Sequence, residues 1–289
     1  MKRKKMTVGK FMIYLILGLF ASTIVVAFLH LFSLSLSPSH IATAGGLHLW
    51  PKELTFRNYE EVFHNYYIWM GYKNTLIRTV IGTVLGLIFT SMGGYVLSKQ
   101  YFPHRSFWTL LIVFTMFFSG GMIPGFLLVK NMGLMNTYAC MILPGLVSAY
   151  NLVIMRNYFQ SLPEELEESA FIDGAGRFTI FLKIVLPISK PILATVALWI
   201  AVGHWNAWYD AMIYIQDVDK MPLQTVLRRI IMTGSQELMQ FDQQQEAEMV
   251  SSEGLKAACI YVATIPIMCV YPFLQRHFVK GIMMGSLKG

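Results

Sequence analysis

The sequence predicts an all-α membrane protein with six transmembrane helices. Hydrophobic residues make up 55% of the 289 residues and charged residues only 13%. The mean hydropathy of +0.52 exceeds what a soluble domain buries in its core. Six blocks contain no Asp, Glu, Lys or Arg, and each is about as long as the roughly 20 residues that carry a helix across the hydrocarbon layer. These blocks are Phe11–Phe32, Thr79–Leu97, Ser106–Val129, Asn131–Met155, Pro191–Tyr209 and Ala257–Gln275.

The blocks divide the chain into three parts. Residues 1–10 form a basic N-terminus, residues 11–276 the transmembrane domain, and residues 277–289 a C-terminal tail. The first block follows the basic run Lys2 to Lys5 and precedes Ala42-Thr43-Ala44, a pattern that a cleavable signal peptide also shows. We interpret it as a signal anchor, because a signal peptide's apolar region is shorter, about 7 to 15 residues. Its removal would also leave an odd number of spans.

The basic residues predict that both termini are cytoplasmic. With the N-terminus inside, the inside segments hold fourteen of the 23 Lys and Arg residues, and the outside segments hold nine. This distribution follows the positive-inside rule. Membrane topology therefore accounts for the net charge of +7, and no nucleic-acid partner is needed to explain it.

Neither a catalytic nor a metal site is predicted. Cys140, Cys259 and Cys269 lie inside apolar blocks, without a CxxC pair, and resemble small buried hydrophobic residues. The seven histidines are scattered along the chain. We expect no catalytic residue, no metal ligand and no cofactor in this chain.

Two outward segments are long enough to carry a function, residues 33–72 and the extracytoplasmic loop 215–256. The second is rich in Gln and acidic residues with apolar residues interleaved, which favours short amphipathic helices. Such a surface is suited to a soluble partner. A solvated loop without a partner is the alternative.

One extended cytoplasmic segment, residues 157–190, separates the fourth and fifth blocks. Ser161-Leu162-Pro163-Glu164 has the form of a capping box and predicts the start of a helix. The helix should end near Gly174-Ala175-Gly176, because glycine accepts the left-handed conformation of a helix end. A second helical stretch, Phe178–Ile188, then leads through Pro187 and Pro191 into the fifth span.

The spacing in this segment matches a known motif. Glu168-Ser169-Ala170 is followed after three residues by Gly174, after nine more by Ile184, and after one more by Leu186-Pro187. This resembles the EAA loop of permease subunits in binding-protein-dependent ABC importers, and Ser169 in place of Ala is the one departure. The segments 118–121, 131–137, 203–206 and 280–289 are similar to carbohydrate permeases of the MalG-type, LplC-like family.

The resemblance implies a type I ABC importer permease fold in a bacterial plasma membrane. It implies a heterodimer with a second permease subunit, two cytoplasmic ATPase subunits, an extracytoplasmic solute-binding protein and a carbohydrate substrate, most simply an oligosaccharide. It places the C-terminal tail against the ATPase pair. The expected ATPase contacts are Glu168, Ser169, Ala170, Asp173, Gly174, Ile184, Leu186 and Pro187. The chain has no GxxxxGK[ST] motif, so ATP and Mg²⁺ belong on the partner ATPase.

A cluster of polar and aromatic residues lies in the fifth block and just after it. Such groups are costly at membrane depth unless they face a cavity or another subunit, and aromatic rings stack on sugars. On a continuous helix His204 would share a face with Trp208. We expect the side with His204, Asn206 and Asp210 to face the translocation path, and an interfacial aromatic belt is the alternative. The candidate path residues are His204, Trp205, Asn206, Trp208, Tyr209 and Asp210.

Close helix packing is predicted in the second block, where Gly82, Gly86, Gly93 and Gly94 leave room for a neighbouring backbone. Three alternatives to a carbohydrate permease stay open. The first is an ABC permease for another solute, and the second is a scaffold or exporter component. The third is a secondary transporter, which predicts internal repeats that the sequence does not show.

Overall fold

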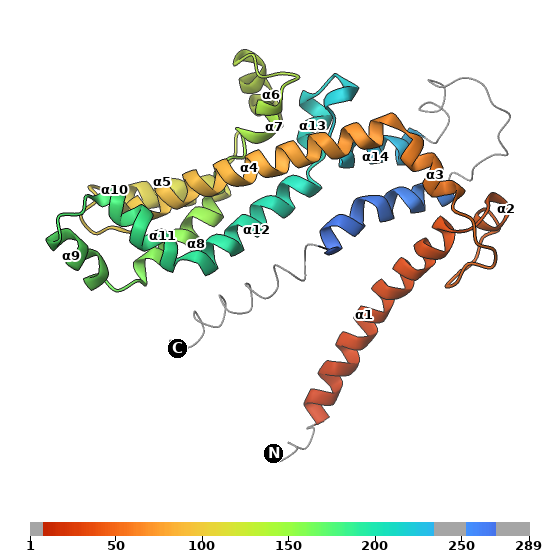
Figure 1. Ribbon diagram of the computed structural model, residues 1–289, viewed down its shortest axis with the longest axis horizontal. Helices are drawn as coiled ribbons and strands as arrows, with labels where there is room; N and C mark the ends of the chain where they lie inside the picture. The colour runs from red at the N-terminus through yellow and green to blue at the C-terminus, as the bar shows by residue number, and fades with distance from the viewer. Residues whose placement is uncertain (1–7, 234–252, 270–289) are drawn as a thin grey trace. The chain divides into compact units, whose positions relative to one another are not determined.

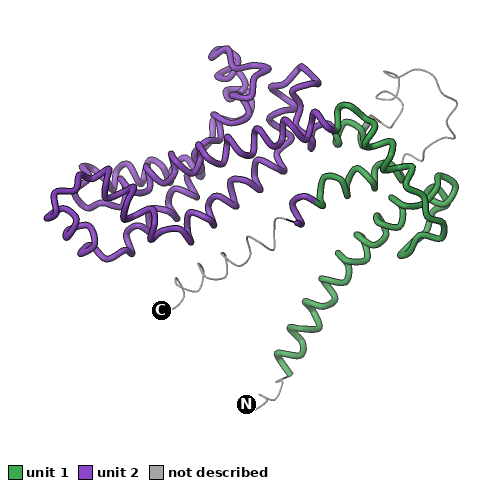
Figure 2. Tube along the Cα trace, viewed as in Figure 1, with its two compact units in different colours: residues 1–68, 227–265 green, residues 69–226, 266–289 purple. Residues whose placement is uncertain are grey.

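The computed structural model describes residues 8–233 and 253–269, which form helices and no strand (Figure 1). The all-α prediction is therefore confirmed. The chain divides into two compact units (Figure 2). Unit 1 comprises Met1–Ile68 with Leu227–Ile265, and unit 2 comprises Trp69–Val226 with Pro266–Gly289.

Unit 1 is built on one long apolar helix, α1 (Val8–Ser35), whose side chains are exposed along most of its length. A helix that is apolar all round is a membrane span or is covered by protein, so the first predicted span is confirmed as a helix. The short helices α2 (Ser39–Ala42) and α3 (Arg57–His64) follow. Asn58 on α3 donates to the carbonyl oxygens of Ser35 and Ser37 at 2.9 and 3.1 Å, which satisfies backbone acceptors at the end of α1.

Unit 2 holds most of the remaining helices. They are α4 (Tyr66–Ser98), α5 (Arg105–Phe117), α6 (Met122–Asn131), α7 (Tyr138–Ile142), α8 (Ala149–Gln160), α9 (Glu165–Ile172), α10 (Arg177–Ile180), the π-helix Phe181–Val185, α11 (Leu186–Ile188), α12 (Lys190–Asn206), α13 (Tyr209–Tyr214) and the 3-10 helix Val218–Lys220. The helix α14 (Leu223–Thr233) begins in unit 2 and buries Leu223, Val226, Leu227 and Ile230 along one face. It lies inside the predicted outer loop, whose Gln-rich part falls outside the described residues.

The glycines of α4 allow close packing, as the sequence predicts. A Cβ atom at Gly86 would lie 3.4 Å from the Ile200 side chain of α12, and one at Gly94 would lie 3.1 Å from the Met155 side chain of α8. Helices α8 and α12 therefore approach α4 more closely than larger residues would allow.

The prediction of continuous third, fourth and fifth spans is wrong. The third bends by 112° between α5 and α6, where Gly121 has a φ of 84°. The fourth is divided into α7 and α8 after left-handed turns at Gly133 and Asn136, and Pro144 separates the two helices. The fifth ends at Asn206, because Ala207 is extended. The absence of charge identifies apolar blocks, whereas Gly, Pro and Asn decide where the backbone of the third and fourth blocks breaks.

The predicted count of six spans stays a prediction. In the described ranges, two helices are long and apolar enough to cross a membrane, α1 and α4, and the count reaches four if each of two bent pairs is one span. Helix α4 begins at Tyr66, well before the predicted start at Thr79. Residues 253–269 form a helix over much of the sixth block. The rest of that block and the predicted C-terminal tail fall outside the described residues.

Candidate functional site

The predicted cytoplasmic loop forms a helical hairpin at one end of unit 2, with α9 as its first arm (Figure 1). Helix α9 ends at Ile172, near the predicted glycines, and Gly174 just after its C-cap has a φ of 81°. The Gly174 amide donates to the carbonyl of Phe171 at 3.0 Å, and the Ala175 amide donates to that of Ala170 at 2.9 Å. These two bonds define a Schellman motif, which satisfies the last carbonyls of the helix.

The predicted capping box is wrong. Ser161 ends α8 instead, because its hydroxyl donates to the Tyr158 carbonyl oxygen at 2.7 Å. Helix α9 begins at Glu165 without a side-chain cap. Three acidic residues nevertheless lie in its first turn, at the positive end of the helix dipole. The start of the helix thus depends on charge and packing rather than on a cap.

The second arm runs from Arg177 to Ile188 as one helical stretch, within a residue of the prediction. Its middle is a π-helix, and the stretch meets α12 at an angle of 84°. The bend lies at Ser189, two residues before Pro191, since proline has no amide hydrogen to continue the ladder from α11 into α12. The loop is therefore joined to α12 at a sharp corner.

The predicted contact residues fall into two groups. Glu168, Ser169, Asp173, Gly174 and Pro187 are exposed. Ala170 is buried in a cluster with large apolar side chains of α4, α8 and the π-helix, and Ile184 and Leu186 pack against the same cluster. The apolar members of the motif thus hold the two arms together, and the polar members with Gly174 present an outer surface. Exposed apolar side chains enlarge that surface: Phe171, Ile172 and Phe178.

The loop is attached to the end of α4 by residues that sequence reasoning missed. Glu167 on α9 pairs with Lys99, and the Tyr95 hydroxyl donates to the Glu167 carboxylate at 3.2 Å. The side chains of Lys99 and Glu167 are only 14% and 18% exposed. The position of Lys99, two residues after the second apolar block, is the signal that was available in the sequence.

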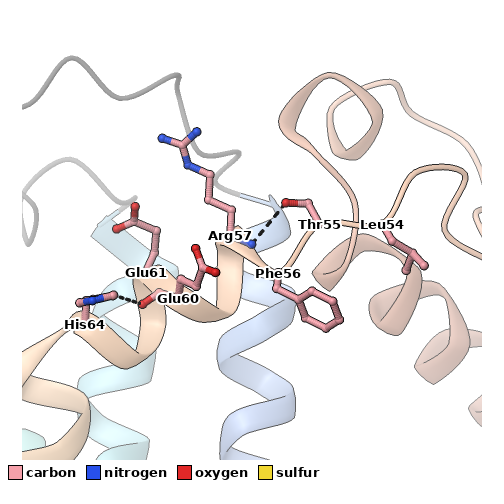
Figure 3. A pocket seen from close by; sticks show the side chains of 7 residues that line it. All are labelled: Leu54, Thr55, Phe56, Arg57, Glu60, Glu61 and His64. Atoms are coloured by element: carbon pink, nitrogen blue, oxygen red, sulfur yellow. Dashed lines mark hydrogen bonds between the residues drawn. The ribbon is translucent and has the colours of Figure 1, made fainter.

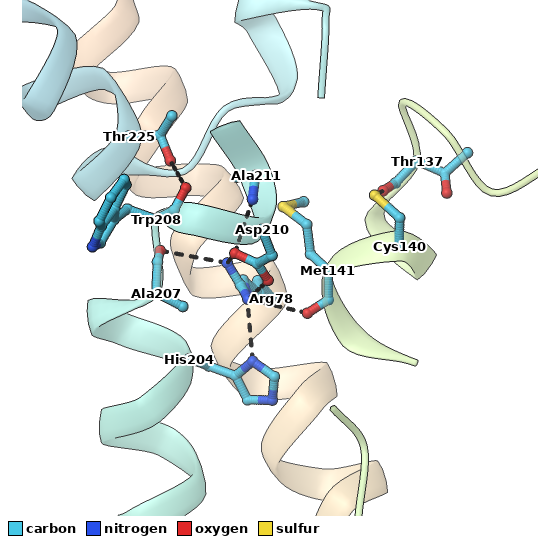
Figure 4. A network of polar contacts seen from close by, with 10 residues as sticks. All are labelled: Arg78, Thr137, Cys140, Met141, His204, Ala207, Trp208, Asp210, Ala211 and Thr225. Atoms are coloured by element: carbon cyan, nitrogen blue, oxygen red, sulfur yellow. Dashed lines mark hydrogen bonds and ion pairs between the residues drawn. The ribbon is translucent and has the colours of Figure 1, made fainter. Parts of the chain in front are cut away.

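The candidate path residues surround a break between α12 and α13. Arg78 of α4 enters this break with a 3% exposed side chain and pairs with Asp210 (Figure 4). Its guanidinium also donates to the Met141 carbonyl at 3.1 Å, to the Ala207 carbonyl at 3.4 Å and to His204 Nδ1 at 3.4 Å. One arginine therefore satisfies backbone carbonyls from two broken helices and brings together α4, α7, α12 and α13.

The break contradicts the prediction that His204 and Trp208 share a helix face. His204 and Asp210 both meet Arg78, whereas the Asn206 amide is exposed and donates to the Val202 carbonyl at 3.1 Å. The three residues that were predicted to share one side of the helix are therefore separated: His204 and Asp210 face Arg78, and Asn206 does not. Arg78 precedes the second apolar block by one residue, so the charge-free pattern leaves it outside the predicted span.

The aromatic candidates occupy three positions around the same break. The ring of Trp205 lies 6.4 Å from that of Tyr72 on α4. The Trp208 carbonyl accepts from the hydroxyl of Thr225 at 3.1 Å. Tyr209 is half exposed, and its hydroxyl lies 2.8 Å from the sulfur of Met122.

Further polar side chains of α4 bond to backbone groups of the segment that follows α13. Asn74 donates to the carbonyls of Asp219 and Met221 at 2.7 and 3.0 Å, and the Thr75 hydroxyl accepts from the Leu223 amide at 2.8 Å. Irregular backbone at membrane depth is tolerated where protein groups satisfy it. One face of α4 supplies those groups, from Asn74 to Arg78.

Unit 1 contains a separate polar hollow at the start of α3 (Figure 3). Its lining carries charges of both signs. The residues that line it are Leu54, Thr55, Phe56, Arg57, Glu60, Glu61 and His64. The backbone amide of Arg57 donates to the Thr55 hydroxyl at 3.3 Å, and His64 Nδ1 lies 2.8 Å from the Glu60 carbonyl oxygen. These contacts are local to α3 and its entry. In the described residues, no group of three or more His, Cys, Asp or Glu side chains is placed to hold a metal ion.

Comparisons with known proteins agree on one family. The family described as "Binding-protein-dependent transport system inner membrane component" matches residues 100–284. Protein LplC of Bacillus subtilis (strain 168) is 41% identical over 95% of this chain and 93% of its own length. The polygalacturonan/rhamnogalacturonan transport system permease protein YtcP of the same organism is 39% identical over 96% of this chain and 97% of its own. A solved chain of a bacterial ABC transporter involved in the import of the acidic polysaccharide alginate has a TM-score of 0.86 and 32% identity, over 96% of this chain and 99% of that one.

Proposed function

Because the chain belongs to the family of binding-protein-dependent transport system inner membrane components, we propose that it is a transmembrane permease subunit of an ATP-driven carbohydrate importer. The observation that supports the substrate class is its likeness, over nearly the whole chain, to a polygalacturonan/rhamnogalacturonan permease and to an alginate importer. An oligosaccharide derived from a polysaccharide is the substrate that we infer.

The outer surface of the cytoplasmic hairpin is the proposed contact with the ATPase. Glu168, Asp173 and Gly174 are exposed there beside the apolar side chains of Phe171 and Ile172. An exposed apolar patch rimmed by charge is typical of a protein interface. Ala170 and the second arm pack into one core cluster, so the hairpin can move as a rigid body when the ATPase displaces it.

The full transporter in this proposal contains further subunits. A second permease completes the translocation path, two ATPase subunits bind ATP and Mg²⁺ and hydrolyse the nucleotide, and an extracytoplasmic binding protein delivers the sugar. In this chain, Trp205, Asn206 and Tyr209 are the proposed path residues. Trp208 holds α14 through its carbonyl, and His204 and Asp210 act through Arg78.

Both termini are cytoplasmic in this proposal, which a labelling experiment tests. In a variant without the three native cysteines, we expect a cysteine at the exposed Ala44 to react with an impermeant maleimide in intact cells. A cysteine at the exposed Ser169 should react only after permeabilisation. Labelling of the Ser169 position from outside would overturn the orientation.

Uptake in proteoliposomes tests the transport function. The chain is purified with its partner permease and ATPase, and reconstituted with the binding protein. We expect ATP-dependent uptake of a labelled oligogalacturonide or alginate oligosaccharide that vanadate abolishes and an ionophore leaves intact. Uptake that persists without ATP and collapses with the ionophore would instead identify a secondary transporter.

A further inference from the structure

A short segment between α4 and α5 touches both arms of the cytoplasmic hairpin. We define the clamp as Lys99, Gln100 and Tyr101. Lys99 pairs with Glu167 on α9, and the Gln100 amide lies 3.5 Å from the Glu164 carboxylate just before it. Tyr101 contacts the other arm, since the Arg177 guanidinium lies 4.0 Å from the centre of its ring. The clamp thus reaches both sides of the Gly174 turn.

The contacts to α9 are stronger than those of an ordinary surface pair. The side chains of Lys99 and Glu167 are mostly buried, so water and salt screen their attraction weakly. Lys99 Nζ also lies 4.7 Å from the centre of the Tyr95 ring, and Tyr95 donates to the same carboxylate. The Tyr95 ring in turn packs against Phe181 of the π-helix at 4.9 Å between centroids. Removal of either charge would leave the other without its partner in a mostly buried position.

We propose that the clamp transmits displacement of the cytoplasmic hairpin to α4. This inference rests on the proposed function, in which the ATPase displaces the hairpin. Helix α4 runs without interruption from Tyr66 to Ser98, directly before Lys99. At 1.5 Å per residue, the 21 residues from Arg78 to Lys99 span about 30 Å. The helix that the clamp holds at one end therefore carries, at the other, the arginine that holds the α12–α13 break.

Lys99, Glu167 and Tyr101 are accordingly positioning residues rather than contacts with the ATPase. Without the Lys99–Glu167 pair, α9 keeps the Schellman motif at its C-terminal end, and Gly174 remains exposed to a partner. Its movement is then less firmly tied to α4. Loss of the pair should therefore separate ATP hydrolysis from sugar movement without releasing the ATPase.

The test compares Lys99→Met, Glu167→Gln and the exchange variant Lys99→Glu/Glu167→Lys in the reconstituted full complex. We expect each single variant to retain the ATPase subunits and to transport on the order of tenfold fewer sugars per ATP hydrolysed. The exchange variant should recover most of that ratio, because it restores an ion pair. Tyr101→Leu, which removes only a cation–π contact, should lower the ratio about threefold. Lys220→Met serves as the control, because it breaks a half-exposed pair with Asp217.

Three results would overturn the clamp. The first is that the single variants transport as many sugars per ATP as the parent. The second is that the exchange variant transports no more sugars per ATP than the single variants. The third is that the single variants release the ATPase. All variants must elute as monodisperse complexes. If the charge variants fail to do so, the sugars transported per ATP by Tyr101→Leu test the proposal instead. Failure of the proposed function is recognised separately, because the parent complex would then show no ATP-dependent uptake.

Discussion

Replacement of Asp210 by alanine is expected to destabilise the protein more than replacement of Arg78 by methionine, although both changes break the same ion pair. Arg78 is 3% exposed and Asp210 is 28% exposed. A guanidinium does not lose its proton in a protein, so Asp210→Ala leaves a buried charge without its counter-ion. In Arg78→Met the remaining carboxylate is the more exposed partner, so water solvates it in part.

The expected sizes follow from what each variant leaves unpaired. Breaking a buried pair by removing one partner costs about 3 to 5 kcal/mol, so Asp210→Ala should lie in that range and Arg78→Met below it. The double variant Arg78→Met/Asp210→Ala should cost less than Asp210→Ala alone, because the neutral carbonyls of Met141 and Ala207 lose a donor at a smaller cost than a buried charge without its counter-ion. The free energy of unfolding of the purified protein in mixed detergent micelles measures all three.

A matched control comes from a second ion pair. Lys220→Met removes the partner of Asp217 in a pair whose side chains are 39% and 40% exposed. Such a pair contributes about 0 to 1 kcal/mol, so this variant should unfold close to the parent. Equal losses for the Asp210 and Arg78 variants, or a double variant that is the least stable of all, would contradict the assignment of Arg78 as the buried charge.

The helical hairpin was predictable because its signals are local. A helix end needs a residue that accepts positive φ, and Gly174 supplies it within a few residues of the apolar positions that it serves. The motif spacing assigned Ala170 and Ile184 to the ATPase contact, whereas the structure buries Ala170 in a core cluster and packs Ile184 against it. The start of α9 was misplaced, because Ser161 fits the end of one helix as well as the start of the next.

The α12–α13 break and its arginine were not predictable in the same way. The stretch from His204 to Asp210 has no proline or glycine to announce an extended Ala207. The conformation is held by Arg78, which is more than a hundred residues away in sequence. Lys99 is likewise paired with a residue far along the chain. Contacts of this kind depend on tertiary structure, and a single sequence shows only that a basic residue flanks an apolar block.

Replacement of Gly174 by leucine is expected to release the ATPase or uncouple it while the chain itself still folds. A Cβ atom at this position would meet nothing within 4 Å, so the first carbon of the leucine side chain meets no part of the described structure. The cost within the chain is the left-handed backbone conformation, about 1 to 2 kcal/mol for a residue with a Cβ atom. That strain shifts the population of the hairpin turn by roughly tenfold. At the proposed interface the added side chain also blocks close approach of a partner backbone.

Two substitutions at glycines separate these effects. Gly176→Leu places the same side chain two residues away, where φ is −70° and a Cβ atom also meets nothing within 4 Å. Gly174→Asn keeps a residue that tolerates the left-handed conformation. We expect Gly176→Leu to retain ATPase and binding-protein-stimulated hydrolysis, Gly174→Asn to be intermediate, and Gly174→Leu to lose most of both, as measured by co-purification and phosphate release. If Gly174→Leu instead retains the ATPase and the stimulated hydrolysis of the parent, the exposed hairpin surface around Gly174 is not the ATPase contact.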